Sequence, residues 1–186
     1  MSHINLRIQV VLITLLSATS LAEPVNAADC WTVGRAEQSE TQKIDIYLDM
    51  IEQWKKGNVN GLVAHMTKDV VWNTAAGIAP PLVGKKNVRA WLQKYAGTVQ
   101  NSRWRVVAYS ESANQLFVEG VEDNEMPNGH RVAIPYAGVY DFRGDKMCGG
   151  RDYFDRGLVD RLKAGEPTPD YVDALNTRDP ISRSVK

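Results

Sequence analysis

Hydrophobic residues recur every three or four positions over the first strongly patterned stretch of the chain, residues 37–56. This spacing places one apolar side on a helix, made of Ile44, Tyr47, Leu48, Ile51 and Trp54. Gly57 follows and predicts the end of that helix. Asn60 can cap a short second helix over residues 61–66, and a third helix is predicted over residues 85–95.

The second half of the chain has the alternating apolar and polar residues that are typical of strands. After a β-rich run at residues 69–74, four strands are predicted, at residues 104–109, 115–124, 132–142 and 147–154. A last helix is predicted at residues 157–164, before a proline-containing tail. This order indicates an α+β fold, with helices packed on one face of a strongly curved mixed or antiparallel sheet. A cone-shaped pocket is expected between the two layers.

The first 27 residues have the order of a secretory signal peptide. Arg7 precedes an apolar run at residues 8–16, and Val25-Asn26-Ala27 is a small-residue cleavage pattern. The run is shorter than the roughly 20 apolar residues that span a bilayer, although an uncleaved anchor is the alternative. We therefore expect an exported protein, periplasmic or secreted, that has a short mature N-terminal segment at residues 28–36, one domain at residues 37–165 and a tail at residues 166–186.

Charge and cysteine content narrow the choice of partners. The chain has 22 basic and 22 acidic residues, so there is no basic excess for nucleic acid or for a membrane surface. Cys30 and Cys148 predict one disulfide in an oxidising compartment, and two unpaired thiols are the alternative. No metal-ligand spacing and no nucleotide-binding motif occurs in the sequence, so we expect neither a metal nor another cofactor.

Alternate residues of a strand face the same side of a sheet, and this rule groups the candidate site residues. Asp152 shares a side with Phe154, and Tyr136 shares a side with Ile134. Glu122 also alternates with small and apolar residues. Because these sides are mostly apolar, we expect Asp152, Glu122 and Tyr136 to be the few polar groups of an apolar cavity. A solvated sheet edge is the alternative for Glu122.

Two carboxyl groups in one dry pocket do not ionise equally. Like-charge repulsion and desolvation move their pKa values apart. One group then serves as a base while the other stays protonated and serves as an acid. Asp152 and Glu122 are therefore the candidate acid–base pair.

Two stretches of the sequence resemble a known family. Arg151-Asp152-Tyr153-Phe154-Asp155, which follows Gly138-Val139-Tyr140 and a Gly-Asp-Lys turn, resembles the last strand of limonene-1,2-epoxide hydrolases. Lys68-Asp69-Val70-Val71-Trp72, followed by Pro80-Pro81 and Gly84, is similar to the first strand and the next helix start of the same family. These hydrolases belong to the NTF2-like or SnoaL-like superfamily, and the resemblance covers roughly residues 41–158.

The resemblance implies a cofactor-free enzyme that adds water to an epoxide of an apolar, terpenoid-like substrate. It places the water-activating base at Asp152 and the acid at Glu122. The arginine that bridges the two acids in the family falls on Gly120, which is a departure from the pattern. The water-holding tyrosine and asparagine fall on Trp72 and Thr74, with Asn73 between them. Relatives pair as dimers, so the resemblance also implies a homodimer.

The sequence is compatible with three functions. The first is epoxide hydrolysis by Asp152 and Glu122. The second is an isomerase, dehydratase or cyclase reaction in which Asp152 moves a proton on carbon, which the missing arginine favours. The third is non-catalytic binding of an apolar molecule. In each case the expected pocket residues are Trp72, Asn73, Thr74, Gly120, Ile134, Tyr136 and Phe154.

Overall fold

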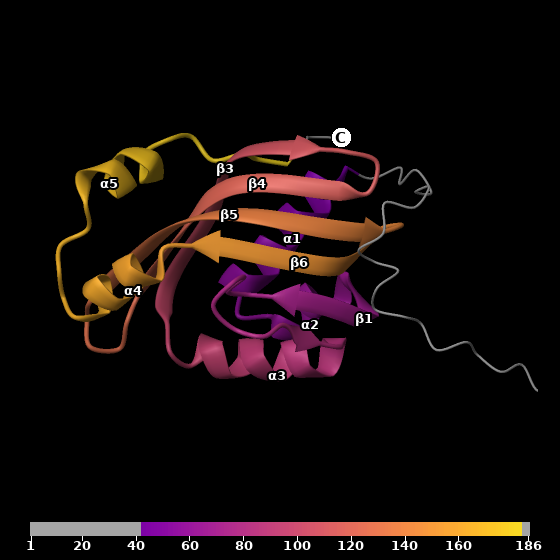
Figure 1. Ribbon diagram of the computed structural model, residues 1–186, viewed down its shortest axis with the longest axis horizontal. Helices are drawn as coiled ribbons and strands as arrows, with labels where there is room; N and C mark the ends of the chain where they lie inside the picture. The colour runs from indigo at the N-terminus through magenta and orange to yellow at the C-terminus, as the bar shows by residue number, and fades with distance from the viewer. Residues whose placement is uncertain (1–41, 184–186) are drawn as a thin grey trace, which may run out of the picture.

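The computed structural model describes residues 42–183 (Figure 1). The predicted signal peptide, the segment at residues 28–36 and Cys30 lie outside these residues. The described elements in chain order are α1 (Lys43–Lys55), α2 (Val59–Ala64), β1 (Met66–Asn73), β2 (Leu82–Val83), α3 (Lys85–Ala96), β3 (Gln100–Glu111), β4 (Gln115–Glu125), β5 (Arg131–Arg143), β6 (Lys146–Phe154), α4 (Arg156–Lys163) and α5 (Asp170–Asn176).

The strands in the described part of the chain form one six-stranded sheet, in the order β2-β1-β6-β5-β4-β3. From β3 to β6 the strands form the predicted antiparallel meander. β1 is different, because it pairs with β6 in parallel and brings Trp72 opposite Gly150. The expected mixed α+β architecture is therefore confirmed. The parallel pair joins segments that are distant in the sequence, so local patterning did not reveal it.

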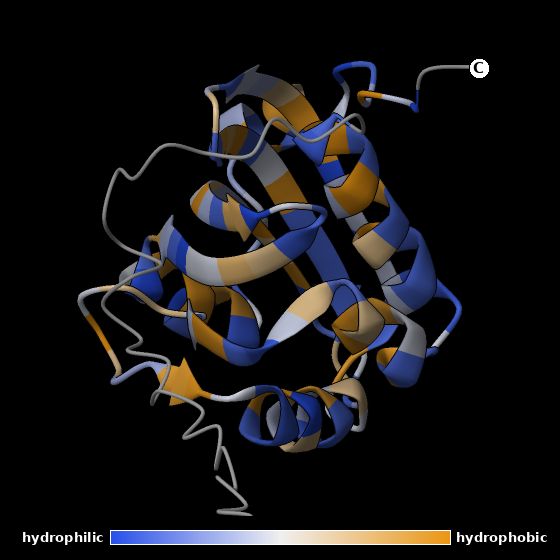
Figure 2. Ribbon diagram, turned by 90° about the vertical axis from the view of Figure 1, so that its right-hand side faces the viewer, coloured by the Kyte–Doolittle hydropathy of each residue, from blue (hydrophilic) through white to orange (hydrophobic). Residues whose placement is uncertain are grey.

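Irregular pairing bends the sheet into a trough. The β3–β4, β1–β6 and β5–β6 pairs all contain register shifts, which increase local twist and curvature. α1 lies across the sheet and contacts β3 and β4, while α3 packs near β1 (Figure 1). In Figure 2 orange and blue positions alternate along the helices and strands, as expected for elements with one buried face.

The buried side of α1 carries the residues that the helical spacing predicts. Ile44, Tyr47, Ile51 and Trp54 are all buried, and Tyr47 has no exposed surface. The first turn lacks a side-chain cap, but the Ile44 N–H donates to Glu111 Oε1 at 2.7 Å. This bond satisfies one of the unpaired amides of the helix start and ties α1 to β3. Tyr47 is thereby held against the middle of the sheet.

Two helices differ from the sequence prediction. α2 begins at Val59, two residues before the predicted start, because Asn58 and not Asn60 is its cap and accepts from the Gly61 N–H at 3.0 Å. The proline-containing tail includes α5, which the sequence did not predict. Pro169 is the N-cap of α5. Proline is tolerated at a helix start because the first amides of a helix have no acceptor within it.

Three glycines allow aromatic rings to lie flat on the sheet. A Cβ added at Gly120 would come within 2.5 Å of Tyr136 Cε1, and one at Gly150 within 2.7 Å of Trp72 Cδ1. A Cβ at Gly138 would lie 2.6 Å from Tyr140 Cε2. Such approaches are far inside van der Waals contact, so each ring depends on the missing side chain beneath it.

Within residues 42–183, no helix has both the length and the apolar character that are needed to cross a membrane.

Gly120→Ala should destabilise the fold by about 1–3 kcal/mol, because the added methyl group would meet both Tyr136 and the backbone oxygen of Arg105 at 2.3 Å. Urea unfolding of both proteins measures the difference. Gly97→Ala is the matched control, since Gly97 has an ordinary negative φ and its nearest neighbour for an added Cβ is at 3.4 Å. Equal stability of the Gly120→Ala variant and the wild type would contradict the close packing of Tyr136.

Candidate active site

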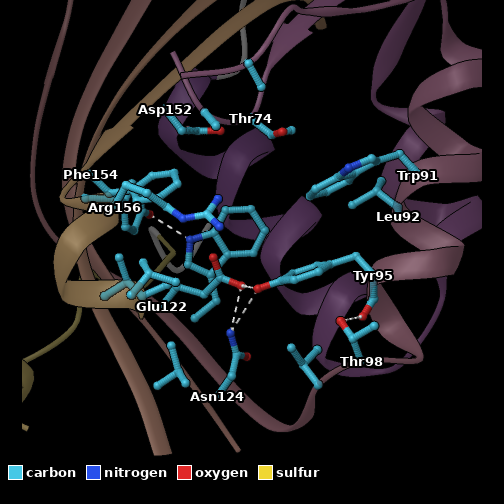
Figure 3. Close-up of a pocket in the computed structure, with 18 of the residues that line it drawn as sticks. Thr74, Trp91, Leu92, Tyr95, Thr98, Glu122, Asn124, Asp152, Phe154 and Arg156 are labelled. Carbon is cyan, nitrogen blue, oxygen red and sulfur yellow. Dashed lines mark hydrogen bonds between the residues drawn. The ribbon is translucent and has the colours of Figure 1, made fainter. Parts of the chain in front are cut away.

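A pocket with a volume of about 370 Å³ opens between the trough of the sheet and the helices α1 and α3. Figure 3 shows Trp91, Leu92 and Tyr95 on the helix side, and Asp152, Glu122 and Phe154 on the sheet side. Most of the lining is aromatic or aliphatic. The lining includes Trp54, Trp72, Thr74, Trp91, Tyr95, Trp104, Glu122, Asn124, Ile134, Tyr136, Asp152, Phe154, Arg156, Val159 and Lys163.

Seven of the residues that the sequence singled out line this pocket together: Trp72, Thr74, Glu122, Ile134, Tyr136, Asp152 and Phe154. Two others have structural positions instead. Asn73 Oδ1 accepts from the Ala75 N–H at 3.2 Å and shapes the turn after β1. Gly120 is buried beneath the ring of Tyr136. Strand parity therefore places both carboxyl groups on the pocket side.

Asp152 is held by one donor on each carboxylate oxygen. Trp72 Nε1, from β1, donates to Oδ2 at 2.7 Å, and the Tyr140 hydroxyl, from β5, donates to Oδ1. Burial raises the pKa of Asp152 to about 6, the two donors oppose that rise, and the nearby Glu122 carboxylate adds to it. Near neutral pH the group is therefore mostly ionised but readily accepts a proton, as a general base must.

A chain of phenols leads to Asp152 through the core, starting from Tyr136 in the pocket lining. Tyr140 and Tyr47 have hydroxyl oxygens 2.6 Å apart, and those of Tyr47 and Tyr136 are 3.4 Å apart. Trp104 Nε1 donates to the Tyr136 hydroxyl at 2.8 Å. Burial, together with the neighbouring acidic groups, raises the pKa of all three phenols, so each keeps its proton.

The direction of this chain follows from counting protons. Each tyrosine has one hydroxyl proton, and Tyr140 uses its own in the hydrogen bond that it donates to Asp152. Tyr47 must then donate to Tyr140, which leaves Tyr47 without a proton for Tyr136. Tyr136 is therefore the one member of the chain that can turn its O–H either to Tyr47 or into the pocket.

Glu122 lies in a second polar group of the pocket. Tyr95 OH and Asn124 Nδ2 both donate to Glu122 Oε1, each at 2.9 Å (Figure 3). Burial raises the pKa of Glu122 even though these two donors oppose the rise. Its protonated form is therefore present at higher pH than that of an exposed glutamate.

Stacked rings form the helix-side wall. Tyr95 and Trp91, one turn apart on α3, stack with ring centroids 5.1 Å apart. Trp54, on α1, also stacks with Tyr95, with ring centroids 5.8 Å apart. The hydrogen bond from Tyr95 to Glu122 therefore starts from a ring that two indoles hold. This wall suits a flat or bulky apolar ligand.

The sequence profile of the SnoaL-like domain matches residues 47–149, which include most of the site. The chain belongs to the SnoaL-like family. No curated protein matches it.

Solved structures share the fold of this SnoaL-like domain at low sequence identity. A protein with a ketosteroid isomerase-like fold from Catenulispora acidiphila, in complex with trimethylamine, is 19% identical with a TM-score of 0.59, over 67% of this chain and 98% of its own. An LEH-like epoxide hydrolase from M. tuberculosis is 16% identical with a TM-score of 0.57, over 64% of this chain and 87% of its own.

A proposed SnoaL-like polyketide cyclase from Shewanella denitrificans is 13% identical with a TM-score of 0.60, and it covers 67% of this chain and 98% of its own. At these identities the likeness extends to the fold alone. The fold is thus shared by proteins named as hydrolases, cyclases and isomerase-like proteins.

Several residues of the candidate site in this SnoaL-like domain were not predicted from the sequence. Tyr140 lies two and four residues beyond Gly138 and Tyr136 on the same side of β5, so strand parity contained that signal. Tyr95 follows Trp91 by four residues on the predicted third helix, and this spacing puts both residues on the same side of the helix. Tyr47 reads as an ordinary core residue of a helix. Asn124 follows Glu122 by two residues, and nothing in the sequence marks its amide.

Among residues 42–183, no three histidine, cysteine, aspartate or glutamate side chains gather as a potential metal site. Cys148 is buried in β6, four residues before Asp152. Its predicted partner Cys30 lies outside the described residues, so the disulfide stays a prediction.

Asp152→Asn should change how stability depends on pH. The pKa of Asp152 in the folded chain, about 6, lies above that of an unfolded aspartate, about 4. Protonated Asp152 therefore stabilises the fold below about pH 4, and that contribution is lost as the pH rises through 6. From pH 4 to pH 8 the wild type should lose about 2–3 kcal/mol relative to the variant.

Chemical denaturation of both proteins at pH 4 and pH 8 measures this difference. Asp179→Asn, at an exposed position, should follow the wild type at both values. A wild type that gained stability over Asp152→Asn with rising pH would show that the pKa of Asp152 is lowered instead.

Tyr140→Phe should raise the pKa of Asp152 above 6, because the variant lacks one of the two donors that stabilise the carboxylate. The pH dependence of the Asp152 carboxyl ¹³C chemical shift measures it. Tyr153→Phe is the control, since Tyr153 is on the same strand as Asp152 but is 47% exposed. An unchanged or lower pKa in Tyr140→Phe would rule out this role of the hydroxyl.

Proposed function

We propose that the protein is a cofactor-free hydrolase that adds water to an epoxide of an apolar small molecule. The observation that carries this proposal is the presence of two carboxyl groups with different surroundings in one aromatic pocket. Asp152 is held by an indole and a phenol, while Glu122 is held by a phenol and an amide. Such a pair supplies the base and the acid that this reaction needs.

Asp152 is the proposed base. Trp72 and Tyr140 fix its orientation and each uses one lone pair of a different oxygen, so lone pairs are left for a water molecule. Thr74 lines the pocket next to Asp152 (Figure 3). Its hydroxyl can hold the other side of that water. In the proposed step the water oxygen bonds to an epoxide carbon while Asp152 takes the water proton.

Glu122 is the proposed acid. As the carbon–oxygen bond of the epoxide breaks, the protonated carboxyl of Glu122 gives its proton to the departing oxygen, which becomes the second hydroxyl of a diol. The proton on Asp152 then returns to Glu122 through solvent. The overall reaction consumes one water molecule and needs no electron donor or acceptor.

The epoxide hydrolase pattern has an arginine where this chain has Gly120, and the structure has no room for that side chain. An arginine there would collide with Tyr136 and the Arg105 backbone. Trp72 and Tyr140, and not an arginine, hold the Asp152 carboxylate. The LEH-like epoxide hydrolase from M. tuberculosis, which shares the fold, gives this reaction class added support.

One observation favours a second candidate, proton transfer on carbon in an isomerase or cyclase reaction. Tyr136 lines the pocket, accepts from Trp104 and has a free choice for its own proton. Its O–H can therefore donate to a substrate carbonyl oxygen while Asp152 removes a proton from the adjacent carbon. Charge that develops on that oxygen would be stabilised by a preorganised donor.

Export to the periplasm or beyond and homodimer formation, expected from the N-terminal sequence and from the resemblance, are part of the same proposal. N-terminal sequencing of the processed protein tests the first, and light scattering tests the second.

Turnover of terpene or styrene epoxides should fall at least ~100-fold in Asp152→Asn and in Glu122→Gln, because each removes one proton-transfer group. The wild-type rate should pass through a maximum at mildly acidic pH and fall on either side, because the step needs Asp152 ionised and Glu122 protonated at the same time. Diol formation in ¹⁸O-labelled water, followed by mass spectrometry, is the measurement. Asp179→Asn is the control and should keep the wild-type rate.

The isotope result also separates the alternatives. One ¹⁸O atom per product identifies water addition. Deuterium on carbon without ¹⁸O, found with enolisable ketones in heavy water, identifies proton transfer on carbon. Thermal stabilisation by these compounds without any product would contradict both proposed reactions and leave binding as the function.

A further inference from the structure

One side of the pocket has a charge that neither proposed reaction uses. Arg156, Val159 and Lys163 all line the pocket and all come from α4. Their spacing of three and four residues puts them on one side of the helix. α4 therefore presents a stripe of two cations around one apolar residue to the cavity. Figure 3 shows Arg156 beside Phe154 on the sheet side.

The stripe is held in place at both ends of the helix. Asp155 Oδ1 accepts from the Leu158 N–H at 3.1 Å and caps the start. At the other end the His130 ring nitrogen Nδ1 lies 2.9 Å from the Lys163 carbonyl oxygen. Leu158 and Leu162 are buried in the core beneath. The direction in which α4 faces is therefore fixed by the fold.

The acids of the pocket do not neutralise these cations. Asp152 is bonded to Trp72 and Tyr140, and Glu122 to Tyr95 and Asn124. Arg156 has an exposed partner on its own helix, with Nε donating to Asp160 Oδ1 at 2.9 Å, which leaves its terminal nitrogens for another acceptor. Within residues 42–183, the Lys163 ammonium has no hydrogen-bond or ion-pair partner.

We propose that this stripe binds a carboxylate, so that the ligand of the pocket is an apolar acid whose charged end lies against α4. The guanidinium of Arg156 offers paired donors that match a carboxylate, and Lys163 adds a second charge. Val159 and the aromatic wall take the apolar body. The inference rests on the proposed function only in that it takes this pocket as the substrate site.

Isothermal titration calorimetry of the full processed chain with geranic acid and with geranamide tests the proposal, because the two compounds share one apolar skeleton and differ in charge. At pH 8 and low salt, the wild type should bind the acid at least 10-fold more tightly than the amide. Arg156→Gln and Lys163→Gln should each reduce that preference at least 3-fold, and the double variant should remove it. Raising the salt to 0.5 M should weaken binding of the acid and leave that of the amide unchanged.

Arg161→Gln is the matched control, since Arg161 is on the same helix but pairs with Glu166 and does not line the pocket. It should keep the wild-type preference. Equal affinity for acid and amide in the wild type, an equal loss in Arg161→Gln, or no binding of either compound up to 1 mM would overturn the proposal.

The outcome is independent of catalysis, because the readout is binding. A preference for the acid in a protein that opens no epoxide would retain this inference and reject the proposed function. Epoxide turnover that needs Asp152, in a protein that binds acid and amide equally, would do the reverse.

Discussion

The arrangement of the pocket depends on how the Asp152 carboxylate is held. Its two donors come from different strands on either side of β6, Trp72 from β1 and Tyr140 from β5. Both rings reach it by lying flat on the sheet over Gly150 and Gly138. The parallel pairing of β1 with β6 is what brings the indole to this place. A side chain at either glycine would move a donor and leave a buried carboxylate short of a hydrogen bond, which is costly.

Two neighbouring acidic residues of β4, on opposite faces of the sheet, have pKa values that are shifted in opposite directions. Glu122 faces the pocket, and burial raises its pKa. Asp123 faces the other way and is 1% exposed, yet its pKa is lowered, because Arg131, Asn176 and Arg103 outweigh the effect of burial. Asp123 is fully paired and links α5 to the sheet through Asn176 at 2.8 Å. A carboxylate that is paired with arginines stabilises the fold at neutral pH, whereas one that is buried with neutral donors alone is kept at a cost.

Much of the fold and part of the site could be predicted, because both depend on local periods. The alternation of two along strands placed Asp152, Glu122, Tyr136 and Ile134 on the pocket side, and the helical period identified the buried side of α1. The parallel β1–β6 pair and the turn role of Asn73 depend on contacts between distant segments or on one backbone conformation. Arg156 and Lys163 could not be predicted as pocket residues, because the side of α4 that faces the cavity depends on how α4 packs on the sheet.

The energetics of Asp152 argue for a function at this position. Its raised pKa means that the ionised group destabilises the fold near neutral pH, and an asparagine could fill the same volume without that cost. Four further polar groups, Tyr140, Tyr47, Tyr136 and Trp104, form a chain that ends on it. A core that served stability alone would need fewer buried hydroxyl groups than this chain contains. The chain leaves Tyr136 as the only phenol with a choice of acceptor, and that choice faces the pocket. The direction of these hydrogen bonds therefore supports a reaction site that has Asp152 and Tyr136 on one side and Glu122 on the other.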